Sequence, residues 1–225
     1  MKLQLHTWGT GERVVLLIHG LTDDHTTWWR VGSAIADRGY RVVAPDLRGH
    51  GISPRATTYM LADFADDLAE SLPAEADVAI GNSLGGLALS GAVERLRPLR
   101  AIYLDIGWTP IPSTPTRFVP RTAEHTIRRH PAWSEADVQA EISSDARCDP
   151  EVMWQIAAEF NRGMEPPPLV APSLVVAAGD GPMVPPARQN ELRSLGFAVR
   201  EVPRSGHVMH RDRYDDFMAA LDGWI

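Results

Sequence analysis

The sequence predicts an α/β fold, a mostly parallel sheet covered by helices on both faces. Strand-like apolar runs alternate with amphipathic, helix-like stretches along most of the 225 residues. The run Val14–Ile18 is continuously apolar, which is typical of a parallel strand buried on both faces. One long stretch, residues 108–170, contains no convincing strand and interrupts the alternation. We therefore expect an α/β core with an inserted helical segment.

The expected core elements follow from apolar periodicity and from the residues that end each run. The helix expected at residues 59–72, for example, has apolar residues at helical spacing and acidic residues on its other face. We expect strands at residues 14–18, 41–44, 78–80, 101–104, 174–178 and 197–202, and further helices at residues 28–38, 88–96 and 212–225.

Proline-rich flanks bracket the inserted segment, at residues 110–120 and 166–168. Between them lie helix-like stretches around residues 122–129, 134–144 and 150–160. Because the segment leaves after one sheet strand and returns before the next, we expect it to lie over the carboxyl ends of the strands, where α/β sheets bind ligands. The predicted division is a core of residues 1–107 and 171–225 with a helical cap of residues 108–170.

Composition excludes several classes of function. The formal net charge is −7 and the 22 Lys and Arg residues are dispersed, so we expect no nucleic-acid partner. There is no run of about 18 apolar residues and no apolar signal-peptide region at the start, so we expect no membrane association and a cytoplasmic location. The sequence has no zinc-site pattern and no glycine-rich phosphate loop, so we expect neither metal nor cofactor.

The most informative motif is Gly81-Asn82-Ser83-Leu84-Gly85, which directly follows a strand-like run and precedes a helix-like one. This context predicts a nucleophile elbow, a sharp turn that holds a serine in a strained backbone conformation above the sheet. Small residues are needed on both sides of Ser83, because a side chain at Gly81 or Gly85 would collide with the neighbouring strand or helix.

Three further motifs accompany Ser83: His19-Gly20-Leu21 after the first strong strand, the loop at residues 46–53 after the next, and Ser205-Gly206-His207 near the end. Together, in this order and over nearly the whole chain, they closely resemble the α/β-hydrolase superfamily. The resemblance implies a serine hydrolase in which nucleophile, acid and histidine follow one another along the chain.

A serine hydroxyl needs a base that takes its proton and an acid that orients the base. The resemblance implies Ser83 as nucleophile and His207 as base, and His210 is the one serious rival for the base. It also implies that the backbone amides of Leu21 and Leu84 stabilise the oxyanion.

Two aspartates compete for the role of the acid. Members of the superfamily most often carry it in a Gly-x-x-Asp loop before Pro-x-Val-Pro. Here, matching the Pro-x-Val-Pro tail places Gly181 at the usual position of the acid and Asp180 one residue away. Some capped relatives take the acid from the end of an earlier strand, where this chain has Asp105. We predict Asp105, with Asp180 as the alternative.

A serine nucleophile indicates acyl transfer to water and disfavours epoxide hydrolases and dehalogenases, which attack with a carboxylate. We predict hydrolysis of a small apolar carboxylic ester or lactone, with Trp28, Trp108 and Met183 lining the site. The alternatives are a carbon–carbon bond hydrolase, a thioesterase, or a non-catalytic ligand-binding member, which the irregular Asp180-Gly181 loop would suit. The expected partner is a small molecule, and the sequence leaves the oligomeric state open.

Overall fold

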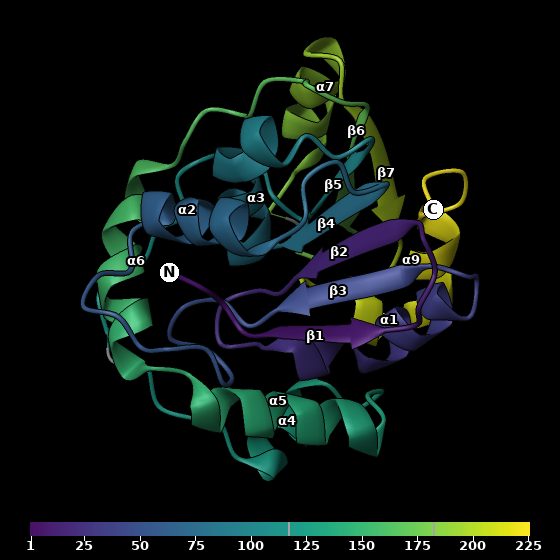
Figure 1. Cartoon of the computed structure of the whole chain (residues 1–225). Coiled ribbons are helices and arrows are strands. Elements are labelled where there is room, and N and C mark those ends of the chain that lie inside the picture. Colours follow the sequence, from purple (N-terminus) through teal and green to yellow (C-terminus); the bar gives the residue numbers. More distant parts are fainter. Residues whose placement is uncertain (117, 182) are drawn as a thin grey trace.

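The computed structural model describes residues 1–116, 118–181 and 183–225. Within these ranges the strands form one seven-stranded sheet in the order β1-β3-β2-β4-β5-β6-β7 (Figure 1). Strand β1 pairs antiparallel with β3, and the other neighbouring strands pair in parallel. The strands are β1 Leu5–Trp8, β2 Val14–Ile18, β3 Arg41–Pro45, β4 Val78–Asn82, β5 Ala101–Leu104, β6 Ser173–Ala178 and β7 Ala198–Val202.

Helices cover both faces of the sheet, which confirms the predicted fold class (Figure 1). Strand β2 shows why, because its side chains alternate between two cores: Leu16 and Ile18 pack on one face, and Val15 and Leu17 on the other. The helices are η1 His25–Trp28, α1 Trp29–Ala36, α2 Leu61–Ser71, α3 Leu84–Leu96, α4 Ala123–Arg129, α5 Glu135–Arg147, α6 Pro150–Arg162, α7 Pro186–Ser194, α8 Met209–Asp212 and α9 Tyr214–Ala220.

The two cores belong to two helical layers. Helices α2 and α3 pack together on one face, where Phe64 and Leu89 are fully buried. Helices α1 and α9 cover the other face with Ile35 and Phe217. None of the helices in the described ranges is long and apolar enough to cross a bilayer.

Four elements differ from the sequence prediction. One is helix α7, Pro186–Ser194, where no helix was predicted. Strand β1 was not predicted, because it is an edge strand with exposed side chains and therefore lacks an apolar run. Helix α3 begins at Leu84 rather than residue 88, since it follows the turn at Ser83 directly. The helix expected at residues 212–225 is shorter, since α9 spans Tyr214–Ala220. The separate helix α8 precedes it, and Arg213 between them has a φ of −143° and a ψ of 60°, which are not helical.

The segment between β5 and β6 contains α4, α5 and α6, as the helix-like stretches predict. Helix α6 lies on the side toward which the arrowheads of β2 and β3 point, and α4 and α5 lie beyond the β1 edge (Figure 1). Residue 117, in the expected proline-rich flank, lies outside the described residues. Because β4 and β5 run parallel to β2, their carboxyl ends lie on the same side of the sheet as α6.

Candidate active site

Ser83 lies in the sharp turn between β4 and α3. Its φ of 50° and ψ of −119° fall where non-glycine residues are strained, as expected for a nucleophile elbow. The flanking glycines allow this turn: a Cβ added to Gly81 would lie 2.5 Å from the Cα of Gly86, and one added to Gly85 would lie 2.5 Å from the carbonyl oxygen of Ile18. These close approaches confirm the predicted need for small residues around Ser83.

A histidine and a buried carboxylate meet beside this turn. The Nδ1 atom of His207 lies 2.8 Å from Oδ2 of Asp105, whose residue is only 1% exposed. The other carboxylate oxygen of Asp105 accepts the backbone N–H groups of Ala178, at 3.3 Å, and Met183, at 3.2 Å. A carboxylate held in this way favours a proton on Nδ1, and it leaves Nε2 of His207 to accept one.

The other candidate acid has a different place. The side chain of Asp180 is exposed, and its backbone N–H donates to the carbonyl of Ser205 at 2.9 Å. Asp180 thus supports the turn before His207 through its backbone, and the carboxylate that contacts the imidazole is that of Asp105. Pro182, part of the loop pattern used in the sequence comparison, lies outside the described residues.

The two residues expected to supply oxyanion donors belong to segments next to Ser83. Leu84 is the first residue of α3, and the first amides of a helix have no partner within it. The segment carrying Leu21 also passes close, since a Cβ added to Gly20 would lie 3.4 Å from the Cβ of Ser83. Leu21 itself is partly buried and packs against the core.

Two buried histidines brace the loops around the site. Nδ1 of His19 donates to the carbonyl of Gly20 at 2.8 Å, and its Nε2 accepts the backbone N–H of Leu47 at 2.9 Å. Nδ1 of His50 lies 2.8 Å from the carbonyl of Arg48. Burial lowers the pKa of both imidazoles, that of His50 to about 3, so both are neutral supports for their loops.

A cavity of about 420 Å³ contains both Ser83 and His207 in its wall. Its lining is mainly apolar, and it includes Trp108 and Met183, two of the three residues expected there. The indole N–H of Trp108 donates to Oγ of Ser90 at 2.9 Å, which fixes the orientation of the ring. The arrangement offers a hydroxyl, an imidazole and an apolar space for a small molecule.

A smaller cavity of about 190 Å³ lies next to the first. Phe160 of α6 and Ser113 line both cavities, and Leu21 lines the smaller one. The Phe160 side chain therefore lies between the larger cavity and the loop of Leu21.

The expectation that Trp28 lines the pocket is not met. Its side chain is fully buried in the core beneath α1 and stacks on the ring of His210, with 4.3 Å between ring centroids. Trp28 is the last residue of η1, and its side chain fills the core between the sheet and the helices α1 and α9 rather than the pocket. The same stacking buries His210, the rival base, which is only 2% exposed.

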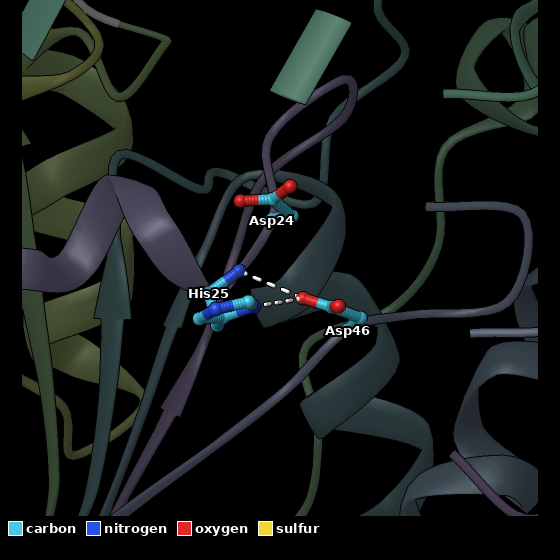
Figure 2. A group of neighbouring side chains, drawn as sticks. All are labelled: Asp24, His25 and Asp46. Carbon is cyan, nitrogen blue, oxygen red and sulfur yellow. Dashed lines mark hydrogen bonds and ion pairs between the residues drawn. The ribbon is translucent and has the colours of Figure 1, made fainter. Parts of the chain in front are cut away.

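A second group of titratable residues lies at Asp24, His25 and Asp46, whose possible metal-ligating atoms lie within 4.8 Å of one another (Figure 2). Oδ1 of Asp46 accepts the backbone N–H of His25 at 2.9 Å and contacts its Nδ1 at 2.8 Å (Figure 2). Oδ2 of Asp24 accepts Nε of Arg147 at 2.8 Å. The bond to Asp46 raises the pKa of His25. Although burial opposes it, the same bond helps lower the pKa of Asp46 to about 2. These pairs already satisfy the carboxylates, so we interpret the group as a loop brace.

Buried ion pairs attach α5 to the loop after β2. Arg211, 7% exposed, donates to Glu141 at 2.5 Å and to Asp23 at 3.1 Å. Arg121 lies 2.8 Å from the same Glu141 and donates to the hydroxyl of Thr22 at 2.7 Å. Burial raises the pKa of Asp23 to about 7, against the opposing effect of Arg211. We call these five residues, Thr22, Asp23, Arg121, Glu141 and Arg211, the ionic anchor. Thr22 directly follows Leu21, whose amide is expected to stabilise the oxyanion.

A family model described as the alpha/beta hydrolase family matches residues 15–221. The chain belongs to this family. This alpha/beta hydrolase is 25% identical to an sn-1-specific diacylglycerol lipase from Mus musculus, over 94% of this chain and 80% of the relative.

Solved structures share the fold at lower identity. An E-2-(acetamidomethylene)succinate hydrolase has a TM-score of 0.78 at 20% identity, covering 99% of this chain and 94% of that one. An N-formylmaleamic acid deformylase from Pseudomonas putida has a TM-score of 0.79 at 21% identity, covering 98% and 96%. Membership of the family and these neighbours indicate a hydrolase.

Sequence reasoning missed two residues of this hydrolase site, Asn82 as a link to the histidine turn and Glu159 as part of the cavity lining. The side-chain amide of Asn82 donates to the carbonyl of His207 at 3.4 Å and so links the elbow to the histidine turn. The position of Asn82 directly before Ser83 is the sequence feature that could have identified it. Glu159 and Phe160 of α6 line the larger cavity. The spacing of Val152, Ile156 and Phe160 indicates the buried side of α6, but it does not show that Glu159 borders the cavity, because that depends on how the helix packs.

Proposed function

We propose that this alpha/beta hydrolase cleaves a small apolar carboxylic ester or lactone through an acyl-enzyme, with Ser83 as nucleophile, His207 as base and Asp105 as the orienting acid. The observation that carries the proposal is the 2.8 Å contact between His207 and the buried Asp105, in the cavity whose wall also holds the strained Ser83. Residues 108–170 act as the cap over this cavity.

The first half-reaction forms the acyl-enzyme. Nε2 of His207 takes the proton of the Ser83 hydroxyl as Oγ attacks the carbonyl carbon, and Asp105 stabilises the imidazolium that results. The carbonyl π electrons move to oxygen, and the amides of Leu21 and Leu84 stabilise this oxyanion. The carbon–oxygen bond to the leaving group then breaks, and His207 gives its proton to the departing alkoxide.

The second half-reaction repeats these steps with water. His207 takes a proton from water as its oxygen attacks the acyl carbon, and the bond to Ser83 breaks as His207 returns that proton to Oγ. The products are the carboxylic acid and free enzyme. In a lactone the alcohol and acid belong to one molecule, so ring opening and release follow the same sequence.

The test is hydrolysis of p-nitrophenyl acetate, p-nitrophenyl butyrate and a lactone panel by the wild type and matched variants. Ser83→Ala and Asp105→Asn should each lower kcat by about 10⁴-fold or more. Asp180→Asn is the matched control and should stay within about 3-fold, since its carboxylate is exposed and its contact is made by the backbone.

Other outcomes would redirect the proposal. Turnover of β-diketones or thioesters, but not of oxygen esters, would indicate the carbon–carbon hydrolase or the thioesterase. Equal rates for wild type and Ser83→Ala across the panel would contradict the hydrolytic role of Ser83 and favour a ligand-binding member. A collapse in Asp180→Asn with an active Asp105→Asn would reverse the assignment of the acid.

A further inference from the structure

Two acidic residues, Glu159 and Asp105, belong to the lining of the mainly apolar cavity. Glu159 of α6 belongs to the lining, together with Leu61 at the start of α2 and Phe160 next to it in the chain. Its side chain is only 14% exposed. The other acid in the lining, Asp105, is in contact with His207, so its charge has a local partner.

The side chain of Glu159 has one backbone partner and one side-chain partner in the described part of the chain. One carboxylate oxygen accepts the backbone N–H of Leu61, the first residue of α2, where the helix dipole stabilises a negative charge. The other oxygen lies 3.7 Å from Arg162, whose side chain is 73% exposed and therefore compensates the charge weakly. Among the described residues that line the cavity, Glu159 is thus an acid with no buried cation beside it.

The described lining offers an acidic substrate no cation. Among the residues that the structure describes there, neither lysine nor arginine occurs. A carboxylate on the substrate would lose water, find no partner of opposite charge, and lie near Glu159 in a medium of low polarity. An uncharged acyl chain has no charge to desolvate and is not repelled by Glu159.

We propose that Glu159 is a specificity-determining residue that excludes anionic substrates, so that the enzyme acts on esters or lactones whose acyl and alcohol parts carry no carboxylate. This inference rests on the proposed function of the Ser83 cavity. It separates this chain from the two structural neighbours named for a succinate derivative and a maleamic acid, which share its fold.

A purely structural role for Glu159 predicts something different. If the residue only caps α2, then Glu159→Gln, whose amide oxygen still accepts the N–H of Leu61, should leave substrate preference unchanged. If its charge excludes anions, the same substitution should admit them. Glu165→Gln is the matched control, because it removes the same charge from an exposed position outside the cavity lining.

The experiment compares 4-nitrophenyl hemiadipate, whose acyl chain ends in a carboxylate, with 4-nitrophenyl 6-oxoheptanoate, a neutral analogue of similar shape. In wild type and Glu165→Gln we expect kcat/KM to favour the neutral ester by about 100-fold, the ratio for like charges about 6 Å apart in a medium of intermediate dielectric. In Glu159→Gln the ratio should fall to about 10-fold or less, through faster turnover of the anion.

A second experiment measures, by calorimetry, how tightly Ser83→Ala binds the same two esters. This variant keeps Glu159, and the measurement does not depend on turnover. We expect the neutral ester to bind at least about 10-fold more tightly. Equal binding there, or equal selectivity in wild type and Glu159→Gln, would overturn the proposal. Equal turnover by wild type and Ser83→Ala would instead contradict the hydrolase mechanism, and the calorimetric ratio alone would then decide on the exclusion of anions.

Discussion

Helices α5 and α6 of the inserted segment are attached to the core by different forces. Helix α5 is held by the ionic anchor, in which Arg211 and Glu141 are almost fully buried. Helix α6 packs through apolar side chains such as Val152 and Ile156, and it turns Phe160 toward the cavity. A buried ion pair tolerates little change, because removing one partner strands the other charge, whereas apolar contacts can repack.

This difference suggests a division of labour within the segment. The anchor includes Thr22 and Asp23, which directly follow Leu21, so it holds the segment that we propose stabilises the oxyanion. Helix α6 forms another wall of the site, and apolar side chains of this helix can repack. We therefore expect stability to be most sensitive at the anchor and substrate preference to be most sensitive at α6.

The largest effect should come from breaking the anchor at Arg211. Arg211→Ala leaves Asp23 and Glu141 buried without their shared partner and should lower the free energy of unfolding by about 3–5 kcal/mol. Urea unfolding followed by tryptophan fluorescence measures this loss. Arg213→Ala removes a nearby ion pair between half-exposed side chains and should cost about 0.5 kcal/mol or less. A loss below about 1 kcal/mol in Arg211→Ala would refute the anchor.

A smaller loss is expected from Asp46→Asn, in the brace beside the anchor. The pKa of Asp46 is lowered to about 2, below the value of about 3.9 in an unfolded chain, so its contribution of about 2 kcal/mol is present above pH 4. That contribution disappears as the pH falls through about 2. The difference in the free energy of unfolding between wild type and Asp46→Asn should therefore reach its full value of about 2 kcal/mol at pH 6 and decrease between pH 4 and pH 2.

Unfolding free energies at pH 6, 4 and 3 measure this difference. Asp215→Asn is the control, because that carboxylate is 94% exposed and should show a small difference at every pH. A difference for Asp46→Asn that grows toward acid would contradict the lowered pKa.

On the apolar side, Phe160→Ala should change specificity more than stability. The side chain lines both cavities, so its loss should join spaces of about 420 and 190 Å³. Two further buried methylene groups are worth about 1.6 kcal/mol, so the kcat/KM ratio of p-nitrophenyl octanoate to hexanoate should rise by about 10-fold. Trp154→Ala, half-exposed on the same helix and outside both linings, is the control. An unchanged ratio in Phe160→Ala would contradict the role of α6 as the variable wall.

Local patterns in the sequence predict much of the core and part of the site. Strands buried on both faces, such as β2 and β5, are readable because every side chain is apolar, whereas the exposed edge strand β1 has no such signature. Ser83 is marked by glycines that the close approach of neighbouring backbone requires.

Features that depend on long-range packing could not be predicted. The sequence favoured Asp105 over Asp180 only through resemblance to some capped relatives, because the burial and loop geometry that bring Asp105 to His207 exist only in the folded chain. Trp28 was expected in the pocket because it follows a strand, yet its side chain fills the opposite core. The side of α6 that carries Glu159 is likewise decided by packing.

The smallest expected effect has the opposite sign and concerns a buried polar group on the anchored side. Neither ring nitrogen of His210 has a hydrogen-bond partner in the described part of the chain, and burial lowers its pKa well below the ordinary value. His210→Phe keeps a ring to stack on Trp28 and removes two unsatisfied polar atoms, so thermal unfolding should show a gain of about 1 kcal/mol. Ester hydrolysis should stay within about 2-fold, because the proposed base is His207. A loss of stability would show that buried polar atoms on this side stabilise the fold even without partners, and the contrast between an ionic anchor and an apolar wall would then need a different physical basis.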